Sequence, residues 1–398
     1  MAGSFPTLKS GNTVWYPLQD THSFGTGVLR FLDDTEQRWR ARLMLRRFKL
    51  VCKEVNAYDA SLILQFFRSQ FGKFDATWSL TIGAETINNL AFSTDTFQVT
   101  EEKRNRVSFI FDVEQRKSAA PTIPSVGSYF PQINSAGIMT SLPYVLQYDY
   151  KTILNEMATG KQYSYKWRST PLGKFAIQLN PITDTELTVV QNYFYGMEGR
   201  KGEFTFMDPG GNLVNYSDNY SHASWSNASL TVGSAQTDPY GGSLATRLTS
   251  GGSNALLYTT VIPSGNASGF VVCASIWARA ASSGQQLSIG FIDSGFSVIG
   301  NTIWDLPQNQ WRRISHSMTL ATNSYIRVLI GGFATWGSGR VIDLFGAQCS
   351  PTPAPGPRLL TPGFDGLRIK CRFDTDDFTV NKLQVNNNSV TLPVAEYA

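Results

Sequence analysis

Few residues of this chain have the types and spacing that enzymatic or metal chemistry requires. Its three histidines, His22, His222 and His316, do not lie beside a cysteine or carboxylate at the spacing of a metal site. No GxSxG nucleophile motif and no glycine-rich phosphate loop occurs. The sequence therefore predicts no catalytic residues and a protein that is not an enzyme.

Paired carboxylates are the remaining route to catalysis, because most glycoside hydrolases use two of them. The adjacent pairs are Asp33 with Asp34 and Asp376 with Asp377. Neighbouring residues of a strand point to opposite faces, so neither pair would converge on a substrate. Asp218, Asp238, Asp293, Asp305 and Asp343 follow in the second half of the chain, with nothing that groups them. A glycan hydrolase is kept as an alternative function.

Aromatic side chains offer non-covalent chemistry, since an exposed ring stacks on the apolar side of a sugar. Between residues 216 and 350 the tryptophans are Trp225, Trp277, Trp304, Trp311 and Trp336. Trp277 lies in an apolar alternating run and Trp311 begins another, so both are expected to be structural. Trp304 precedes a proline turn and Trp336 lies among glycines, which is loop-like sequence. The predicted carbohydrate-binding residues are therefore Trp304 and Trp336.

The four cysteines, Cys52, Cys273, Cys349 and Cys371, are far apart in the sequence. A chain made in a reducing cytosol keeps such residues as buried thiols. We expect four thiols here, with a Cys273–Cys349 disulfide as the alternative.

Composition favours β structure with many turns and gives no case for nucleic acid or membrane. Aromatic residues make up 13% of the 398 residues, and glycine and proline are frequent. A net charge of +4 is too weak for an electrostatic footprint on nucleic acid. The basic stretch from Arg38 to Lys49 alternates with apolar residues, which indicates a solvated or subunit-facing strand edge. No secretory signal and no apolar run of ~18 residues is visible.

Two parts of the chain repeat the same succession of elements. The run from Phe5 to Leu8 recurs from Phe130 to Ile133. In each part a strand leads into a capped amphipathic helix, over residues 56–71 and 183–195, and a strand rich in aromatic residues follows. Superposition of the copies is expected to place Phe67 on Phe194 and Phe97 on Phe378. The predicted fold is mainly β with α+β elements, built from two antiparallel sheet-plus-helix domains.

The second copy is interrupted by a guest that changes character. Residues 216–362 are rich in Ser, Gly, Asn and Thr, and alternating apolar runs recur at short spacing without a convincing helix. This pattern predicts an antiparallel β-sandwich. The predicted domains are 1–120, then 121–215 together with 363–398, and the inserted sandwich 216–362. Residues 351–357 are proline-rich and are predicted to be a stiff exit linker.

The motifs of the two copies resemble known families. The run Phe24–Gly27, then Glu36–Arg38, an aromatic helix and the run Phe97–Glu101 resemble the phage minor tail protein family. In the second copy, Phe194, Gly199, Phe204–Phe206 and Asp208 before Pro209 are similar to the related distal tail proteins. The guest resembles the jelly-roll carbohydrate-binding domains of phage and surface proteins, through Asp238–Ala245, Trp311 with Arg312, and Phe345–Gln348.

These resemblances imply a structural component of a bacteriophage tail tip, located in the virion and assembled in the host cytoplasm. Such a protein would form a homo-oligomeric ring of six or three copies, with the tail tube protein and hub or baseplate proteins as partners. The inserted jelly roll would bind a host surface glycan during adsorption, with no specific nucleic-acid binding and no membrane insertion. The alternatives are a secreted or surface carbohydrate-binding protein and a tail-associated glycan hydrolase.

The jelly-roll resemblance also bears on cofactors. Related sandwiches often carry a structural Ca²⁺, and its ligands here would be Asp343, Asp218 and backbone carbonyls. The alternative is that both are solvated turn residues, and no other cofactor is expected.

Overall fold

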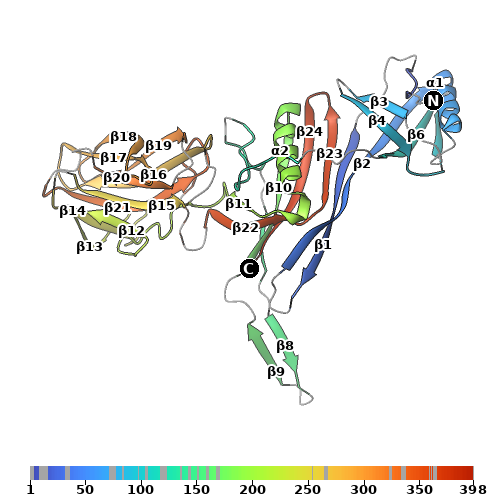
Figure 1. Cartoon of the computed structure of the whole chain (residues 1–398). Coiled ribbons are helices and arrows are strands. Elements are labelled where there is room, and N and C mark those ends of the chain that lie inside the picture. Colours follow the sequence, from blue (N-terminus) through green and yellow to red (C-terminus); the bar gives the residue numbers. More distant parts are fainter. Residues whose placement is uncertain are drawn as a thin grey trace. The chain divides into compact units, whose positions relative to one another are not determined.

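The structure, a computed structural model, describes most of the chain (Figure 1). The described residues are 4–8, 17–31, 36–70, 78–82, 85–96, 98–103, 106–116, 123–134, 137–141, 145–149, 152–157, 161–166, 171–252, 254–263, 268–321, 325–332, 338–357, 359, 361 and 365–397. They form two compact units. The sheet–helix unit comprises Met1–Val126, Ser141–Glu203 and Arg372–Ala398, and the sandwich unit comprises Gly127–Thr140 and Phe204–Cys371.

Two α-helices occur in the described part of the chain, each where the sequence predicts one. Helix α1 spans Ala57–Ser69, and Asn56 caps it by accepting a hydrogen bond from the Asp59 N–H. Helix α2 spans Asp184–Gly196 and begins with a complete capping box between Thr183 and Glu186. No helix in the described part of the chain is long and apolar enough to cross a membrane.

The strands of the first copy are β1 (Leu18–Arg30), β2 (Glu36–Asn56), β3 (Trp78–Ile82), β4 (Glu85–Phe92), β5 (Gln98–Lys103) and β6 (Arg106–Gln115). The later strands outside the inserted sandwich are β7 (Leu146–Asp149), β8 (Thr152–Glu156), β9 (Gln162–Lys166), β10 (Leu172–Ile182), β11 (Phe204–Met207), β22 (Leu367–Phe373), β23 (Asp377–Gln384) and β24 (Asn387–Glu396). A short 3-10 helix, η1, spans Gly199–Lys201. All named pairings are antiparallel.

The strand pairings repeat between the two copies. In the first copy β6 pairs with β2, the strand before the helix, and with its own hairpin partner β5. In the second copy β24 pairs in the same way with β10 and β23. Each copy also has an antiparallel pair that begins with the strand after its helix, β3 with β4 and β11 with β22. The predicted repeat of strand, helix, strand pair and closing hairpin is therefore present in both copies.

Aromatic packing repeats as well. The Phe5 N–H donates to the carbonyl of Ser79 in β3, and the Phe130 N–H donates to the carbonyl of Thr205 in β11, both at 2.9 Å. The ring of Phe67 packs on Phe92, the last residue of β4, at 4.7 Å between centroids. The ring of Phe194 packs on Phe373, the last residue of β22, at 4.9 Å. Phe67 and Phe194 thus occupy equivalent places, whereas Phe97 lies outside the described residues.

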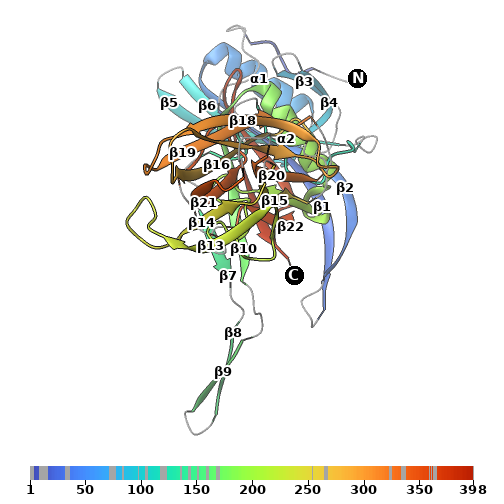
Figure 2. The ribbon, with the colours of Figure 1, turned by 90° about the vertical axis from the view of Figure 1, so that its left-hand side faces the viewer.

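The sandwich consists of two five-stranded antiparallel sheets, ordered β12–β15–β20–β17–β18 and β13–β14–β21–β16–β19 (Figures 1 and 2). Their strands are β12 (Trp225–Ala228), β13 (Leu230–Gln236), β14 (Ala245–Ser250), β15 (Leu256–Ile262), β16 (Val271–Ala280), β17 (Gln285–Ile292), β18 (Val298–Leu306), β19 (Arg312–Thr319), β20 (Ile326–Gly331) and β21 (Val341–Ser350). Fully buried Leu257, Ile276, Phe291 and Ile330 contribute to its core. The protein is mainly β and antiparallel, as predicted.

Residues 351–357 do not behave as a free linker. The Gln132 amide donates to the Pro351 carbonyl at 3.1 Å, and Arg313 donates to the Gly356 carbonyl at 2.7 Å. The stiff-linker prediction is wrong for this segment because main-chain carbonyls between its prolines accept side-chain hydrogen bonds from the sandwich unit. The cysteines are buried free thiols, as predicted, and burial raises the pKa of Cys52 to about 12 and of Cys273 to about 11.

Candidate functional site

The two predicted sugar-binding tryptophans fall in different places. Trp304 lies in strand β18 and pairs with Leu287 of β17, so its prediction as a loop residue is wrong. Pairing along the whole of β18 overrides the turn signal of the proline that follows. Its indole N–H donates to the Ser315 carbonyl at 3.0 Å, and the guanidinium of Arg312 lies 4.7 Å from its ring centroid. Trp336 lies outside the described residues.

The predicted calcium ligands do not fit a cation. Asp343 is buried and accepts hydrogen bonds from Arg247 and Arg279, on both carboxylate oxygens. Asp218 accepts from the Gly346 N–H at 3.0 Å. Two guanidinium groups already neutralise Asp343, and a further cation there would meet positive charge instead of free carboxylate oxygens. Among the described residues, no group of three or more His, Cys, Asp or Glu is placed to hold a metal ion.

The outer face of the β16 sheet carries a cluster of aromatic and charged side chains. Alternate residues of β16, including Ala274, Ile276 and Ala278, are fully buried in the core. The intervening residues, including Trp277 and Arg279, therefore point to the other side of the sheet. Sequence alternation was the available signal for this face, but it identified Trp277 only as a structural residue.

Four aromatic rings gather on this face, which we call the Tyr240 face. Tyr240, from the turn between β13 and β14, lies 6.3 Å from Trp277 and 5.9 Å from Phe345 between ring centroids. Trp311 contacts the other side of Phe345 at 6.5 Å. Tyr240 is 66% exposed, whereas Phe345 is fully buried beneath the cluster. Trp277 and Trp311, predicted to be structural, are partly buried.

The turn that carries Tyr240 is held by one buried carboxylate. Asp238 accepts hydrogen bonds from the N–H groups of Tyr240, Gly242 and Leu244, at 2.8, 3.1 and 3.3 Å. Such an Asp-centred turn fixes the backbone locally, as the sequence Asp-Pro-Tyr-Gly-Gly allows. The exposed Tyr240 ring is thus presented from a rigid support.

Arginines surround the aromatic cluster. Arg247, Asp343 and Arg279 are cross-strand partners on β14, β21 and β16, so they form a row across the sheet. The guanidinium of Arg279 lies 4.7 Å from the ring centroid of Trp311. Arg313 is the cross-strand partner of Trp277, and burial lowers the pKa of its guanidinium. An exposed ring beside fixed guanidinium groups is a combination suited to binding a polar ring-shaped ligand.

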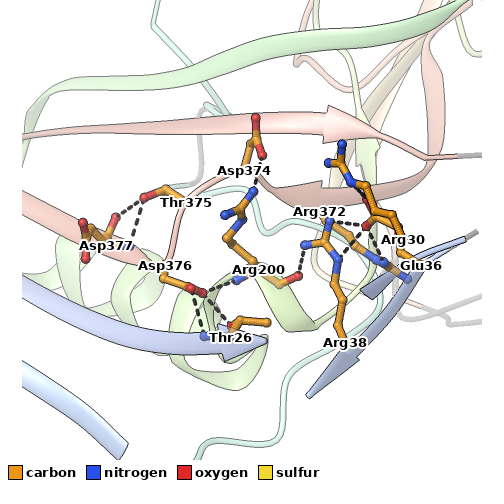
Figure 3. A network of polar contacts seen from close by, with 10 residues as sticks. All are labelled: Thr26, Arg30, Glu36, Arg38, Arg200, Arg372, Asp374, Thr375, Asp376 and Asp377. Atoms are coloured by element: carbon orange, nitrogen blue, oxygen red, sulfur yellow. Dashed lines mark hydrogen bonds and ion pairs between the residues drawn. The ribbon is translucent and has the colours of Figure 1, made fainter. Parts of the chain in front are cut away.

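In the sheet–helix unit, motif residues meet around Asp376 (Figure 3). The Asp376 carboxylate accepts from the N–H and hydroxyl of Thr26, at 3.0 and 2.6 Å, and from the Arg200 N–H at 3.2 Å. Phe24 lies 5.9 Å from Phe194 between ring centroids. The neighbouring Asp377 accepts from Ser23 instead. The two adjacent aspartates therefore have separate partners, as predicted, and form a structural cluster.

The Glu36–Arg38 motif forms a second part of this network. The Glu36 carboxylate is buried and pairs with Arg30 at 2.6 Å and with Arg38 (Figure 3). Arg40 pairs with Glu198. The prediction of a solvated or subunit-facing strand edge is wrong for Arg38, because the Arg38 side chain is only 3% exposed. Arg38 and Arg40 therefore form ion pairs within the unit.

A buried polar network also lies between β1 and α2. His22 contacts the hydroxyl of Tyr195 and lies 3.2 Å from Asp20, and Arg46 bridges Asp20 and Glu85. Burial would raise the pKa of Asp20, but His22 and Arg46 lower it well below its ordinary value. Both His22 and Asp20 are at most 3% exposed. With so little access to a substrate, the network is a structural one.

Comparisons with known proteins concern about a third of the chain. The first xylan-binding domain of Paenibacillus barcinonensis Xyn10C is 12% identical with a TM-score of 0.28, covering 37% of this chain and 99% of that domain. A family 22 carbohydrate-binding module of Clostridium thermocellum Xyn10B is 13% identical with a TM-score of 0.29, covering 37% and 99%. The tailspike protein 4 of bacteriophage CBA120 is 15% identical with a TM-score of 0.27, covering 36% and 22%. No family model and no curated protein matches the chain.

Proposed function

We propose that this chain is a non-enzymatic structural protein of a bacteriophage tail tip whose sandwich unit binds a glycan on the host surface. The observation that carries the glycan part is the Tyr240 face. There, one exposed ring on a rigid turn stands beside two partly buried indoles and three guanidinium groups. Rings of this kind stack on sugars while charged groups bind the hydroxyl and acidic substituents.

The tail-tip part of the proposal is supported by a motif cluster in the sheet–helix unit and by the repeat of the first copy in the second. Motifs that resemble tail proteins meet in the Asp376 cluster, and the strand, helix, strand pair and closing hairpin of the first copy recur in the second. Leu29 and Phe31, at the end of β1, and Trp39, on β2, are about half exposed and offer an apolar contact for a neighbouring copy. A ring of six or three copies, joined to the tail tube and to a hub or baseplate, follows as part of the proposal.

The non-enzymatic part is supported by the state of the described aspartates. A hydrolase would need two carboxylates that face one sugar at a separation of about 5–10 Å. Asp238 is occupied by its own turn and Asp343 by two arginines. Asp293 accepts from two N–H groups of its turn, and Asp305 accepts from Gln286. Each is engaged in a local contact of the fold.

Binding to host cells tests the site. Tyr240→Ala with Trp311→Ala is expected to weaken binding of the full-length protein by roughly tenfold or more, because each stacking contact contributes about 0.5–1.5 kcal/mol. Trp304→Ala is the matched control, since Trp304 lies on β18, in the other sheet of the sandwich. Unchanged binding in the double variant, with loss in the control, would move the site to Trp304. Thermal unfolding of each variant shows whether the fold is retained.

The ring is tested separately. Native mass spectrometry of the full chain is expected to give the mass of three or six copies, and electron microscopy of particles should place the ring at the tail end. A dispersed monomer that still binds glycan would favour the secreted carbohydrate-binding protein.

A further inference from the structure

Three buried hydrogen-bond donors on the Tyr240 face have no acceptor. They are Nε1 of Trp277, Nε1 of Trp311 and Nε2 of Gln348. Arg313 donates to the Gln348 Oε1 at 2.8 Å, which fixes the amide so that Nε2 is directed elsewhere. These side chains add to the number of hydrogen-bond donors on this face, while the acceptor Oε1 of Gln348 is already taken.

Positive charge exceeds negative charge among the same side chains. Arg247, Arg279 and Arg313 contribute three guanidinium groups, and Asp343 is the carboxylate that two of them share. Arg313 donates only to uncharged acceptors, namely Ser275 Oγ, Gln348 Oε1 and the Gly356 carbonyl. Arg247 is also 40% exposed, so one guanidinium is accessible from solvent. The face therefore presents donors and a net positive charge.

We propose that the glycan bound by the Tyr240 face is anionic, with a carboxylate or phosphate on the sugar directed at Arg247. This inference rests on the proposed glycan binding and names its chemical class. A carboxylate or phosphate oxygen only accepts hydrogen bonds, which matches a face whose charged groups in excess are arginine donors. A guanidinium binds either anion through two parallel N–H groups.

A neutral sugar matches this face less well. Its hydroxyl groups both donate and accept, so a good site for it offers acceptors as well as donors. Around Tyr240 the Asp343 carboxylate is already shared by two arginines, and Oε1 of Gln348 is taken by Arg313. A neutral ring would stack on Tyr240 and accept hydrogen bonds from the arginines, but its hydroxyl protons would find neither of these acceptors free.

An array of purified bacterial polysaccharides tests whether the bound glycan is anionic. It holds capsular and O-antigen polysaccharides, both neutral and acidic. Each acidic glycan is printed untreated, after chemical reduction of its carboxylates to alcohols, and after removal of its phosphates. The full-length protein is expected to bind acidic glycans, and one of the two treatments should abolish that binding. The effective treatment identifies which anion is recognised. Binding is also expected to fall as NaCl rises from about 50 to about 500 mM.

Three variants localise the site. Arg247→Gln is expected to weaken binding to the acidic glycan roughly tenfold or more, the loss of a charge-assisted hydrogen bond. Arg247→Lys should restore part of the affinity because the charge remains. Arg312→Gln removes the same charge beside Trp304 and should leave the affinity unchanged. Melting temperatures of all three variants show whether the sandwich stays folded.

The possible failures are distinguishable. Binding that survives both treatments, or binding to neutral glycans alone, overturns the anionic class and leaves glycan binding in place. An acidic glycan bound equally by wild type and Arg247→Gln overturns the placement. Binding to no glycan on the array counts against the proposed function itself.

Discussion

Gly199 lies against the carboxylate of Asp376 in a conformation that favours glycine. Its φ is +64°, and a β-carbon added there would be 2.9 Å from Oδ1 of Asp376. The next residue, Arg200, donates its N–H to the same oxygen at 3.2 Å. The absence of a side chain at Gly199 therefore lets Asp376 join η1 to the hairpin of β1 and β2.

Gly199→Ala is expected to destabilise the sheet–helix unit by about 1–3 kcal/mol, since left-handed backbone strain adds to the clash with Asp376. Gly284→Ala is the control: its φ is +70°, and no atom lies within 4 Å of an added β-carbon. It should cost only the strain, about 1–2 kcal/mol. Urea unfolding measures both. An equal loss of unfolding free energy in the two variants would show that the clash with Asp376 does not contribute.

Acid should unfold the sheet–helix unit through Asp20 and Glu85. Burial opposes the charge on Asp20, but His22 and Arg46 hold its pKa well below the ordinary 3.8; the hydrogen bond from Arg46 lowers the pKa of Glu85 from 4.5. A lowered folded pKa stabilises the fold above the ordinary value, and this contribution is lost as the pH falls below it. We expect on the order of 2 kcal/mol to disappear as the pH falls from about 5 to about 2.

Asp20→Asn tests that assignment. This variant should be less stable at neutral pH, and its stability should fall less steeply in acid. Asp149→Asn, which removes an exposed pair with Lys174, should leave the acid profile unchanged. If the stability of Asp20→Asn fell in acid as steeply as that of the wild type, other carboxylates would be responsible for the acid sensitivity.

The sandwich unit should respond to acid at a higher pH, through His316. Burial lowers its pKa below the ordinary 6.5, and its Nε2 has no hydrogen-bond partner while Nδ1 lies 2.9 Å from the Thr302 hydroxyl. The unfolded chain then takes up the proton more readily, so stability falls as the pH drops below about 6.5. Melting temperatures from pH 8 to about 5 should show this decline. His316→Gln should flatten it, and His222→Gln should not.

A buried ion pair joins Asp208, which ends the aromatic strand motif, to Arg368. Two guanidinium N–H groups donate to one Asp208 oxygen, at 3.0 and 2.9 Å, and both side chains are at most 6% exposed. Asp208→Asn should destabilise the sandwich unit by about 3–5 kcal/mol, because it removes the carboxylate charge that faces the buried Arg368 guanidinium. The double variant Asp208→Asn with Arg368→Met should recover part of this loss. A double variant worse than the single one would show that Arg368 contributes mainly through packing.

Local signals in the sequence predicted the helices and the repeat correctly. The caps of α1 and α2 join residues three apart, Asn56 with Asp59 and Thr183 with Glu186. Such contacts form within a single turn, so residue types at short spacing are enough to predict them. The alternation of apolar residues predicted the β-sandwich in the same way, although it did not place several of its strands, among them β18 around Trp304.

The candidate site depended on tertiary structure. Asp343 meets Arg247 and Arg279, which lie 96 and 64 residues away along the chain. Their meeting requires β14, β21 and β16 to be neighbours in one register, and a shift of a single residue would turn each side chain to the other face. Residue types therefore determined by themselves that the chain forms capped helices, a repeat and a β-sandwich. Only the folded sheet decided which charges and rings share a face, because strand order and register join residues that local sequence does not relate.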